Sequence, residues 1–206
     1  MMRHMGTVVP TPPDGPLAEA DGAALARIAV ASVRARLVGE PLADAVPEAD
    51  VLRSAGASFV TLERRGRLRG CVGTLQAARP LYLDVIRNAR RAMTDPRLPP
   101  VDTDDWPELD VKVSVLTSPV RLPAADRDAL LAGLRPGVDG LLLTDGDRRA
   151  TFLPAVWQRL IEPAEFVAAL LVKGGWPPHG WPTGITAHRY AAHEYHDPAP
   201  RDPITG

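Results

Sequence analysis

The chain has 206 residues, of which 45% are hydrophobic and 24% are charged, values typical of a globular protein. This length fits one domain, with room for two lobes, and buries enough surface to need no metal or disulfide for its core. The net charge of −1 disfavours a protein whose main role is to neutralise a nucleic-acid backbone, and the single cysteine excludes an internal disulfide. Because the sequence also lacks a membrane-length apolar run and the apolar stretch of a signal peptide, we expect a cytoplasmic protein.

The first half of the chain predicts a helix, a hairpin and a second helix. Residues 1–16 are rich in proline and glycine, which indicates a disordered N-terminal segment. The elements expected next are a helix over 20–39 with Asp21 as its N-cap and Gly39 as its C-terminal stop, a weakly structured loop over 40–54, a strand over 57–63, a turn at 64–66, its return strand over 67–75, and a helix from Pro80 to Met93.

The second half predicts further strands interrupted by helices. The expected elements are a stiff loop over 95–100, a strictly alternating strand over 111–115, a helix over 126–134, a hairpin of 141–144 and 149–153 joined through Asp145-Gly146, a helix over 163–173, a last strand over 185–190 and a loose tail over 198–206. Hairpins combined with helices, without a regular βαβ alternation, predict an α+β fold.

The segment Leu-Arg-Gly-Cys-Val-Gly at 68–73 is the most unusual local sequence. On a strand, residues two apart share a face, so Arg69, Cys71 and Gly73 are expected on one side of the sheet. A cation beside a thiol favours the thiolate, which is the nucleophilic form. Cys71 is therefore a candidate catalytic nucleophile with Arg69 as its activating cation. The alternative is that Cys71 is a small buried hydrophobic residue.

Two glycines within one strand predict close approaches to its backbone. Gly70 is expected to face the packed side and to admit a neighbouring element, so that Gly70→Val costs about 1–3 kcal/mol of stability. Gly73 is expected to flank the site on the face of Cys71, and Gly73→Ala to leave the melting temperature nearly unchanged.

Other polar residues give weaker signals. Asp95 and Arg97, in a proline-flanked loop, are candidate ligand-binding residues, although a local ion pair is an equal alternative. Lys173 is a further candidate, with neutralisation of a helix C-terminus as its alternative. Three histidines near the C-terminus (His188, His193 and His196) lack a helical spacing that would gather them, so we predict no metal site and no cofactor.

Several motifs in a fixed order resemble the AMMECR family, whose prokaryotic members are called AmmeMemoRadiSam system protein A. They are Phe-Val-Thr-Leu at 59–62, Leu-Arg-Gly-Cys-Val-Gly-Thr-Leu at 68–75, Asp-Pro-Arg at 95–97, Phe-Leu-Pro at 152–154 and Lys-Gly-Gly at 173–175. The resemblance covers residues 20–195. Leu98 and Gly174 depart from the family's usual phenylalanine and alanine, and neither change removes an ionisable group.

The resemblance implies a single AMMECR-type α+β domain of two lobes over residues 17–197, with mixed or antiparallel strands, flanking helices and a cleft at the Leu-Arg-Gly-Cys segment. It also implies two partners, a Memo-type protein and a radical S-adenosylmethionine enzyme. We therefore expect an enzyme-like or accessory component acting with these partners, with a small molecule or a peptide as a further candidate ligand. A non-catalytic protein-binding module is the alternative, and nucleic-acid binding ranks third because of the net charge.

Overall fold

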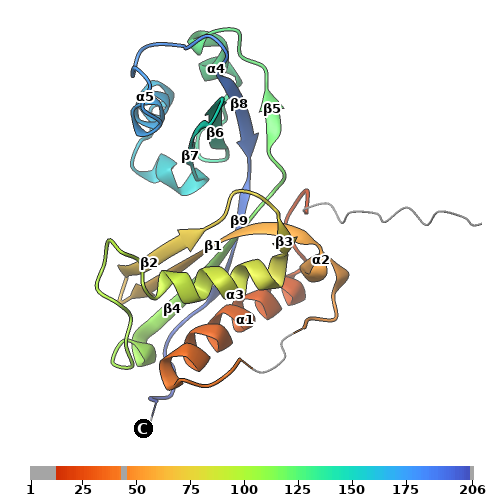
Figure 1. The fold of residues 1–206 in the computed structure, drawn as a ribbon, viewed down its shortest axis with the longest axis vertical. Coiled ribbons are helices and arrows are strands. Elements are labelled where there is room, and N and C mark those ends of the chain that lie inside the picture. Colours follow the sequence, from red (N-terminus) through yellow and green to blue (C-terminus); the bar gives the residue numbers. More distant parts are fainter. Residues whose placement is uncertain (1–12, 43–45, 205–206) are drawn as a thin grey trace, which may run out of the picture. The chain divides into compact units, whose positions relative to one another are not determined.

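The computed structural model describes residues 13–42 and 46–204 (Figure 1). Most of the N-terminal segment predicted to be disordered lies outside the described residues. The chain divides into two compact units: unit 1 comprises residues 1–116 and 193–206, and unit 2 comprises residues 117–192. Both contain an antiparallel sheet with helices, which confirms the predicted α+β class. Within the described part of the chain, no helix has the length and apolarity required to cross a membrane.

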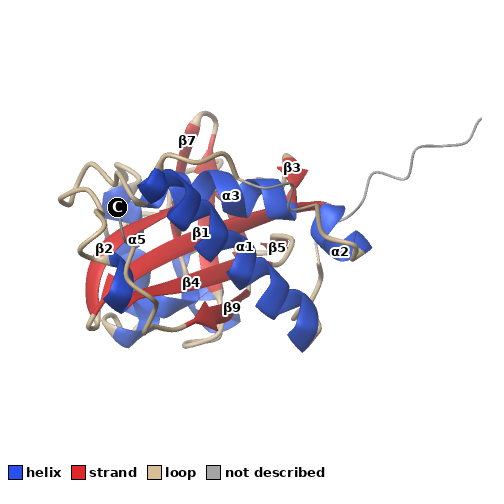
Figure 2. Cartoon of the chain, turned by 90° about the horizontal axis from the view of Figure 1, so that it is seen from below, coloured by secondary structure: helices blue, strands red, loops and turns tan. Residues whose placement is uncertain are grey.

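Unit 1 is a five-stranded sheet covered on one face by two helices (Figure 2). Its elements are α1 (Glu19–Val38), α2 (Asp50–Arg53), β1 (Ala55–Arg64), β2 (Arg67–Gly73), β3 (Arg79–Pro80), α3 (Leu81–Ala92), the 3-10 helix η1 (Trp106–Glu108), β4 (Leu109–Leu116) and β9 (Ala192–Asp197). The strand order is β2-β1-β4-β9, and β3 pairs with the start of β1.

Strand alternation explains how this sheet builds a core on one face only. In β4, Val111, Val113 and Val115 are buried against the helices, whereas Lys112 and Ser114 between them are only half-buried. Strictly alternating side chains point to opposite faces of a strand, so this pattern separates a helix-covered face from a polar face. We call the second face, which does not contact α1 and α3, the open face of the sheet.

The ends of α1 show which local signals are reliable. Gly39 adopts a left-handed conformation (φ 70°) and ends the helix as predicted, since glycine takes that conformation without steric cost. The prediction of Asp21 as the N-cap is wrong. The helix begins at Glu19, after Ala18, and Asp21 lies in the first turn, where a carboxylate still favours the helix dipole. Residues 50–53, expected within a loop, form α2.

Unit 2 is a four-stranded antiparallel sheet in the order β5-β8-β6-β7. Its elements are β5 (Val120–Leu122), α4 (Arg127–Gly133), β6 (Gly140–Asp145), β7 (Arg148–Phe152), the 3-10 helix η2 (Pro154–Gln158), α5 (Pro163–Lys173) and β8 (Thr186–Tyr190). The hairpin through Asp145-Gly146 is confirmed. The core is centred on Phe166 of α5, whose ring stacks on Trp157 with 3.8 Å between centroids.

The C-terminal segment is bound to unit 1, contrary to the predicted loose tail. After β8 the chain continues into β9, so the strand over 185–190 is not the last one. Beyond β9, the guanidinium of Arg201 donates to the carbonyl of Leu109 at 3.0 Å and lies over the ring of Trp106. The indole of Trp106 donates to the carbonyl of Asp202 at 3.0 Å. These contacts were hidden from the sequence because they join residues about 90 positions apart.

Candidate functional site

The segment predicted to carry the chemistry forms β2, at the edge of the unit 1 sheet. Cys71 is paired with Thr61 of β1, and the Thr61 hydroxyl donates to the Cys71 sulfur at 3.3 Å. Both side chains lie on the open face, where Cys71 is half-buried. The thiol is therefore neither deep in the core nor fully exposed. The cleft expected around this segment stays a prediction.

Asp95 and Arg97 hold the backbone of Cys71 from the outer side of β2. The Cys71 N–H donates to Asp95 Oδ2 at 3.1 Å, and Arg97 Nη2 donates to the Cys71 carbonyl at 3.0 Å. Arg97 also donates from Nε to Asp95 Oδ1 at 2.9 Å. The ion pair thus occupies both outward-facing backbone groups of an edge strand, as a neighbouring strand would do. This geometry gives Asp95 and Arg97 a positioning role and matches the local ion pair that the sequence left open.

The charges in this clamp stabilise each other. Hydrogen bonds from Arg97 hold the pKa of the Asp95 carboxyl far below its usual range, and the Cys71 N–H lowers that pKa further. The same hydrogen bonds raise the pKa of Arg97, to which the attraction of the nearby Cys71 also contributes. The Asp95 side chain is 1% exposed and that of Arg97 67% exposed, so the carboxylate is committed to the fold while part of the guanidinium reaches solvent.

Arg69 is directed away from the thiol. The pairing register shifts between Leu62 and Glu63, so that Leu62 faces Gly70, Glu63 faces Leu68, and Arg69 is the extra residue of a β-bulge. Its guanidinium donates to Asp105 Oδ2 at 2.6 Å and to the carbonyl of Pro100 at 3.2 Å. The expected pairing of Arg69 with Cys71 is therefore wrong, because the simple alternation that predicted it breaks at the bulge. The cation beside Cys71 is Arg97.

The two glycines of β2 face opposite sides, as predicted, but both are covered. A Cβ on Gly70 would lie 1.9 Å from the backbone oxygen of Ala92, so this glycine admits the C-terminal end of α3. A Cβ on Gly73 would lie 2.2 Å from the ring of Phe59, its cross-strand partner. Because that ring covers Gly73, we expect Gly73→Ala to lower the melting temperature, in place of the nearly unchanged value predicted from the sequence. Phe59 belongs to the site's surroundings and was not singled out from the sequence.

Lys173 lies in unit 2, at the end of α5. Its ammonium donates to the carbonyl of Thr151 at 2.9 Å and sits 5.0 Å from the ring centroid of Phe152. A ligand-binding role for Lys173 stays a prediction. The other lysine, Lys112, pairs with Glu63 on the open face at 2.9 Å, and this hydrogen bond raises the pKa of Lys112.

A buried polar network next to the site was missed by the sequence analysis. Asp84 of α3 is 1% exposed, and its Oδ2 accepts hydrogen bonds from Ser58, Thr74 and Asn88 over 2.6–3.0 Å, while Arg79 donates to Oδ1 at 3.1 Å. The network ties the start of α3 to β1 and to the segment that follows β2. An aspartate at a position facing the core of an amphipathic helix was the available signal, because a buried carboxylate requires partners.

The histidines do not form a metal centre in the described part of the chain. Among residues 13–42 and 46–204, no group of three His, Cys, Asp or Glu side chains is arranged to hold an ion. His196 Nε2 lies 3.5 Å from Asp110 Oδ1 instead.

Comparison with known proteins decides the family. The AMMECR1 family model matches residues 26–195. The chain belongs to the AMMECR1 family. A relative from Methanothermobacter thermautotrophicus is 35% identical over 192 residues, covering 88% of this chain and 97% of the relative. A relative from Thermococcus kodakarensis is 35% identical over 193 residues, covering 87% and 90%. The crystal structure of the uncharacterized protein PH0010 from Pyrococcus horikoshii is similar to this AMMECR1 chain with a TM-score of 0.76 and 31% identity, covering 89% of this chain and 95% of the other.

Proposed function

We propose that this AMMECR1-family chain is an enzyme-like or accessory component whose reactive group is the thiol of Cys71. The observation that carries the proposal is the clamp on Cys71: Asp95 and Arg97 bind both of its outward backbone groups. The buried carboxylate of Asp95 accepts the backbone N–H of Cys71 and thereby fixes the position of the Cys71 side chain on the open face. Such support from surrounding groups is what a reactive side chain needs to hold a productive geometry.

Two polar groups surround the thiol of Cys71. The Thr61 hydroxyl donates to the sulfur, and a donor to an anion is a stronger hydrogen bond than a donor to a neutral acceptor. The guanidinium of Arg97 attracts a negative charge on the sulfur. Thiolates are the nucleophilic form of cysteine, so these two groups support attack on an electrophilic partner or substrate.

Alkylation kinetics test this proposal. Folded protein reacts with iodoacetamide between pH 5 and 9, and mass spectrometry follows modification of Cys71 against N-acetylcysteine under the same conditions. We expect Cys71 to react faster than the free thiol at pH 7. Thr61→Val should lower that rate roughly threefold to tenfold, which corresponds to the typical net contribution of one hydrogen bond. Ser114→Ala, on the same face but opposite Phe59, is the matched control. A wild-type rate at or below that of N-acetylcysteine contradicts the proposal.

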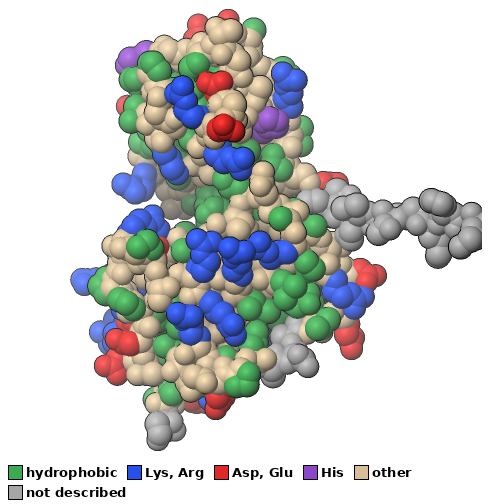
Figure 3. Space-filling view, in the orientation of Figure 1, with side chains coloured by type: hydrophobic (Ala, Val, Ile, Leu, Met, Phe, Trp, Pro, Cys, Tyr) green, Lys and Arg blue, Asp and Glu red, His purple; other side chains and the backbone are tan. Residues whose placement is uncertain are grey.

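A non-catalytic partner-binding role is the second candidate. Figure 3 shows Lys and Arg side chains gathered over the region of α3, and three arginines of this helix, Arg87, Arg90 and Arg91, lie on or near its solvent-facing side. Among the described residues, none of the three forms an ion pair, and Arg87 and Arg91 are exposed, so these two are available to an acidic partner surface.

Co-elution separates the two candidates. The Memo-type protein and the radical S-adenosylmethionine enzyme are each mixed with this chain at micromolar concentration and passed over a sizing column. A partner-binding surface on α3 is supported if Arg87→Glu abolishes this binding and Cys71→Ser leaves it intact. Co-elution of neither protein removes the basis for this candidate. A parallel titration with short RNA and DNA at physiological salt tests nucleic-acid binding, which we expect to be weak.

A further inference from the structure

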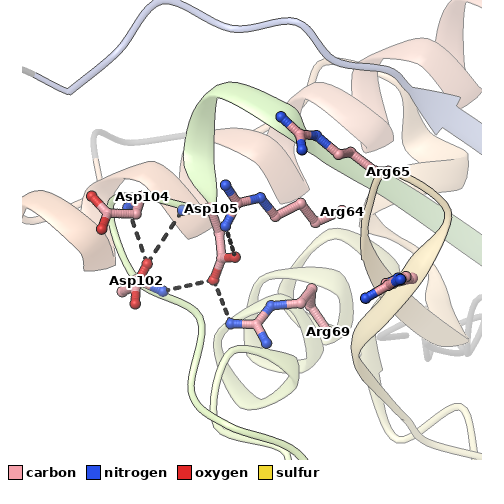
Figure 4. A pocket seen from close by; sticks show the side chains of 7 residues that line it. Arg64, Arg65, Arg69, Asp102, Asp104 and Asp105 are labelled. Carbon is pink, nitrogen blue, oxygen red and sulfur yellow. Dashed lines mark hydrogen bonds and ion pairs between the residues drawn. The ribbon is translucent and has the colours of Figure 1, made fainter.

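A polar pocket of about 670 Å³ lies at the turn of the β1–β2 hairpin in unit 1 (Figure 4). One wall comes from the hairpin and carries the arginines at positions 64, 65, 67 and 69. The opposite wall comes from the loop before η1 and carries Asp102 and Asp104, with Asp105 between the two walls. The site residues of the proposed function, Cys71 above all, do not line this pocket.

The hairpin wall carries more positive charge than its own carboxylates balance. Arg65 and Arg64 share Glu108, and Arg64 and Arg69 share Asp105. Three guanidiniums therefore lie along two carboxylates, which leaves one positive charge in surplus. Burial raises the pKa of Asp105, but hydrogen bonds from Arg69 and the Asp102 backbone outweigh it, so its pKa is lowered and the carboxylate stays charged.

Two donors on this wall lack a partner among the described residues. Arg67 lines the pocket and makes no hydrogen bond or ion pair there, which adds a second surplus charge. The Nε of Arg69 is buried and has no hydrogen-bond partner, although its Nη2 is used twice. A buried N–H without an acceptor is costly, so the Arg69 guanidinium is held in this place at the expense of one hydrogen bond.

The turn itself is strained in a way that presents an arginine. Arg65 has φ 52° and Gly66 has φ 72°, so both central residues are left-handed. Such turns favour glycine, asparagine or aspartate at the first position, because a Cβ atom is crowded there and only a short polar side chain offsets this with a local hydrogen bond. Arg65 is the sole residue other than glycine with positive φ in the described part of the chain. Backbone strain of this kind is concentrated at functional sites.

The opposite wall offers hydrogen-bond acceptors. Asp102 Oδ1 accepts from the backbone N–H groups of Asp104 and Asp105 at 3.0 and 3.2 Å, which leaves Oδ2 available to the pocket. Asp104 is exposed, and its carboxylate makes no ion pair among the described residues. Carboxylate oxygens in this position accept from hydroxyl or ammonium groups.

From these two walls we infer that the pocket binds a phosphate monoester that carries hydroxyl or amino groups, such as a sugar phosphate. A phosphate monoester has close to two negative charges at neutral pH, which matches the two surplus positive charges of the hairpin wall taken alone. Asp102 and Asp104 balance that surplus across the pocket, so the phosphate group must lie against the arginines and away from these two carboxylates. The planar donor forks of Arg67 and Arg69 suit phosphate oxygens. The hydroxyl or amino groups then lie against Asp102 and Asp104.

Calorimetric titration at fixed ionic strength tests the inference with ribose 5-phosphate, O-phosphoserine, inorganic phosphate and ribose. We expect the first two to bind, inorganic phosphate to bind at least about tenfold more weakly, and ribose not to bind. O-phosphoserine binding tighter than ribose 5-phosphate identifies amino groups as the preferred donors, and the reverse identifies hydroxyls.

Matched variants locate the binding. Arg67→Gln should weaken the binding of ribose 5-phosphate at least about tenfold. Asp104→Asn should weaken the binding of ribose 5-phosphate and leave the affinity for inorganic phosphate unchanged. Arg121→Gln, in unit 2, is the control. The inference is overturned if neither phosphate ester binds, if inorganic phosphate binds as tightly as the esters, or if Arg67→Gln binds like wild type. Cys71→Ser should bind ribose 5-phosphate normally, so failure here is distinct from failure of the thiol proposal.

Discussion

Substitution of Gly70 by alanine measures how closely α3 approaches β2. The added carbon would lie 1.9 Å from the Ala92 carbonyl oxygen, whereas ordinary van der Waals contact begins at 3.4 Å, so helix and strand would have to separate by about 1.5 Å. Because the obstacle is backbone, it cannot rotate away, and we assign the upper end of overpacking costs, about 3 kcal/mol. Alanine also lowers the conformational entropy of the unfolded chain, which raises the free energy of unfolding by about 0.4–1 kcal/mol. The net loss of unfolding free energy should be about 2 kcal/mol.

Urea unfolding followed by circular dichroism, together with thermal melts, tests this value. A loss of about 2 kcal/mol lowers the melting temperature by roughly 4–8 °C for a chain of this size. Gly15→Ala is the control, since nothing lies within 4 Å of its added carbon. Gly73→Ala should cost about 1 kcal/mol, because the half-buried Phe59 ring can turn outward. If Gly70→Ala unfolds like wild type, or if Gly73→Ala costs more than Gly70→Ala, the assignment of the two faces fails.

Three further predictions concern buried polar groups. Because the pKa of Asp95 is lowered in the fold, its ionised carboxylate contributes stability at pH values above the ordinary carboxyl pKa of about 4. This contribution is lost as pH falls toward the lowered pKa, so Asp95→Asn should reduce the difference between the urea midpoints measured at pH 7 and at pH 3. An unchanged difference contradicts the clamp. Burial raises the pKa of Tyr190 to about 12, so ultraviolet absorbance should show its phenol ionising near that pH. The free energy of unfolding should fall as pH rises from about 10 through 12. A Tyr190→Phe variant with the same phenolate titration curve as wild type would refute this. Asp84→Ala leaves five neighbouring donor groups without their acceptor and should cost about 3 kcal/mol in urea unfolding. A loss below about 1 kcal/mol would show that the network is solvated.

Local chemistry explains which elements were predictable from the sequence. The alternation around Val113, the stop at Gly39 and the tight turn at Gly146 each depend on one residue's own conformational preference, and each lies where it was predicted. β9 was missed because Ala-His-Glu-Tyr-His-Asp has no apolar alternation, and it becomes a strand by pairing with β4. β5 was missed because three residues are too short for a period.

The site shows the same limit at the level of side chains. Alternation places Cys71 and Gly70 on opposite faces, and the structure agrees. Alternation cannot reveal a one-residue bulge, and the bulge sends Arg69 to Asp105, 36 positions further along the chain. The clamp on Cys71 was equally out of reach, since Asp95 and Arg97 meet Cys71 only through the tertiary fold.

The connection between β4 and β9 has a consequence for biosynthesis. These strands are neighbours in one sheet, yet the whole of unit 2 is inserted between them in the sequence. β9 also carries Tyr195, whose hydroxyl accepts from the Leu17 N–H at 2.6 Å and whose ring lies over Gly22 of α1. A ribosome therefore releases all of unit 2, a continuous segment, before it releases the strand that completes unit 1. During translation the edge of β4 in unit 1 therefore stays unpaired until β9 has been synthesised. A chain truncated before residue 193 leaves that edge exposed to pairing with another molecule.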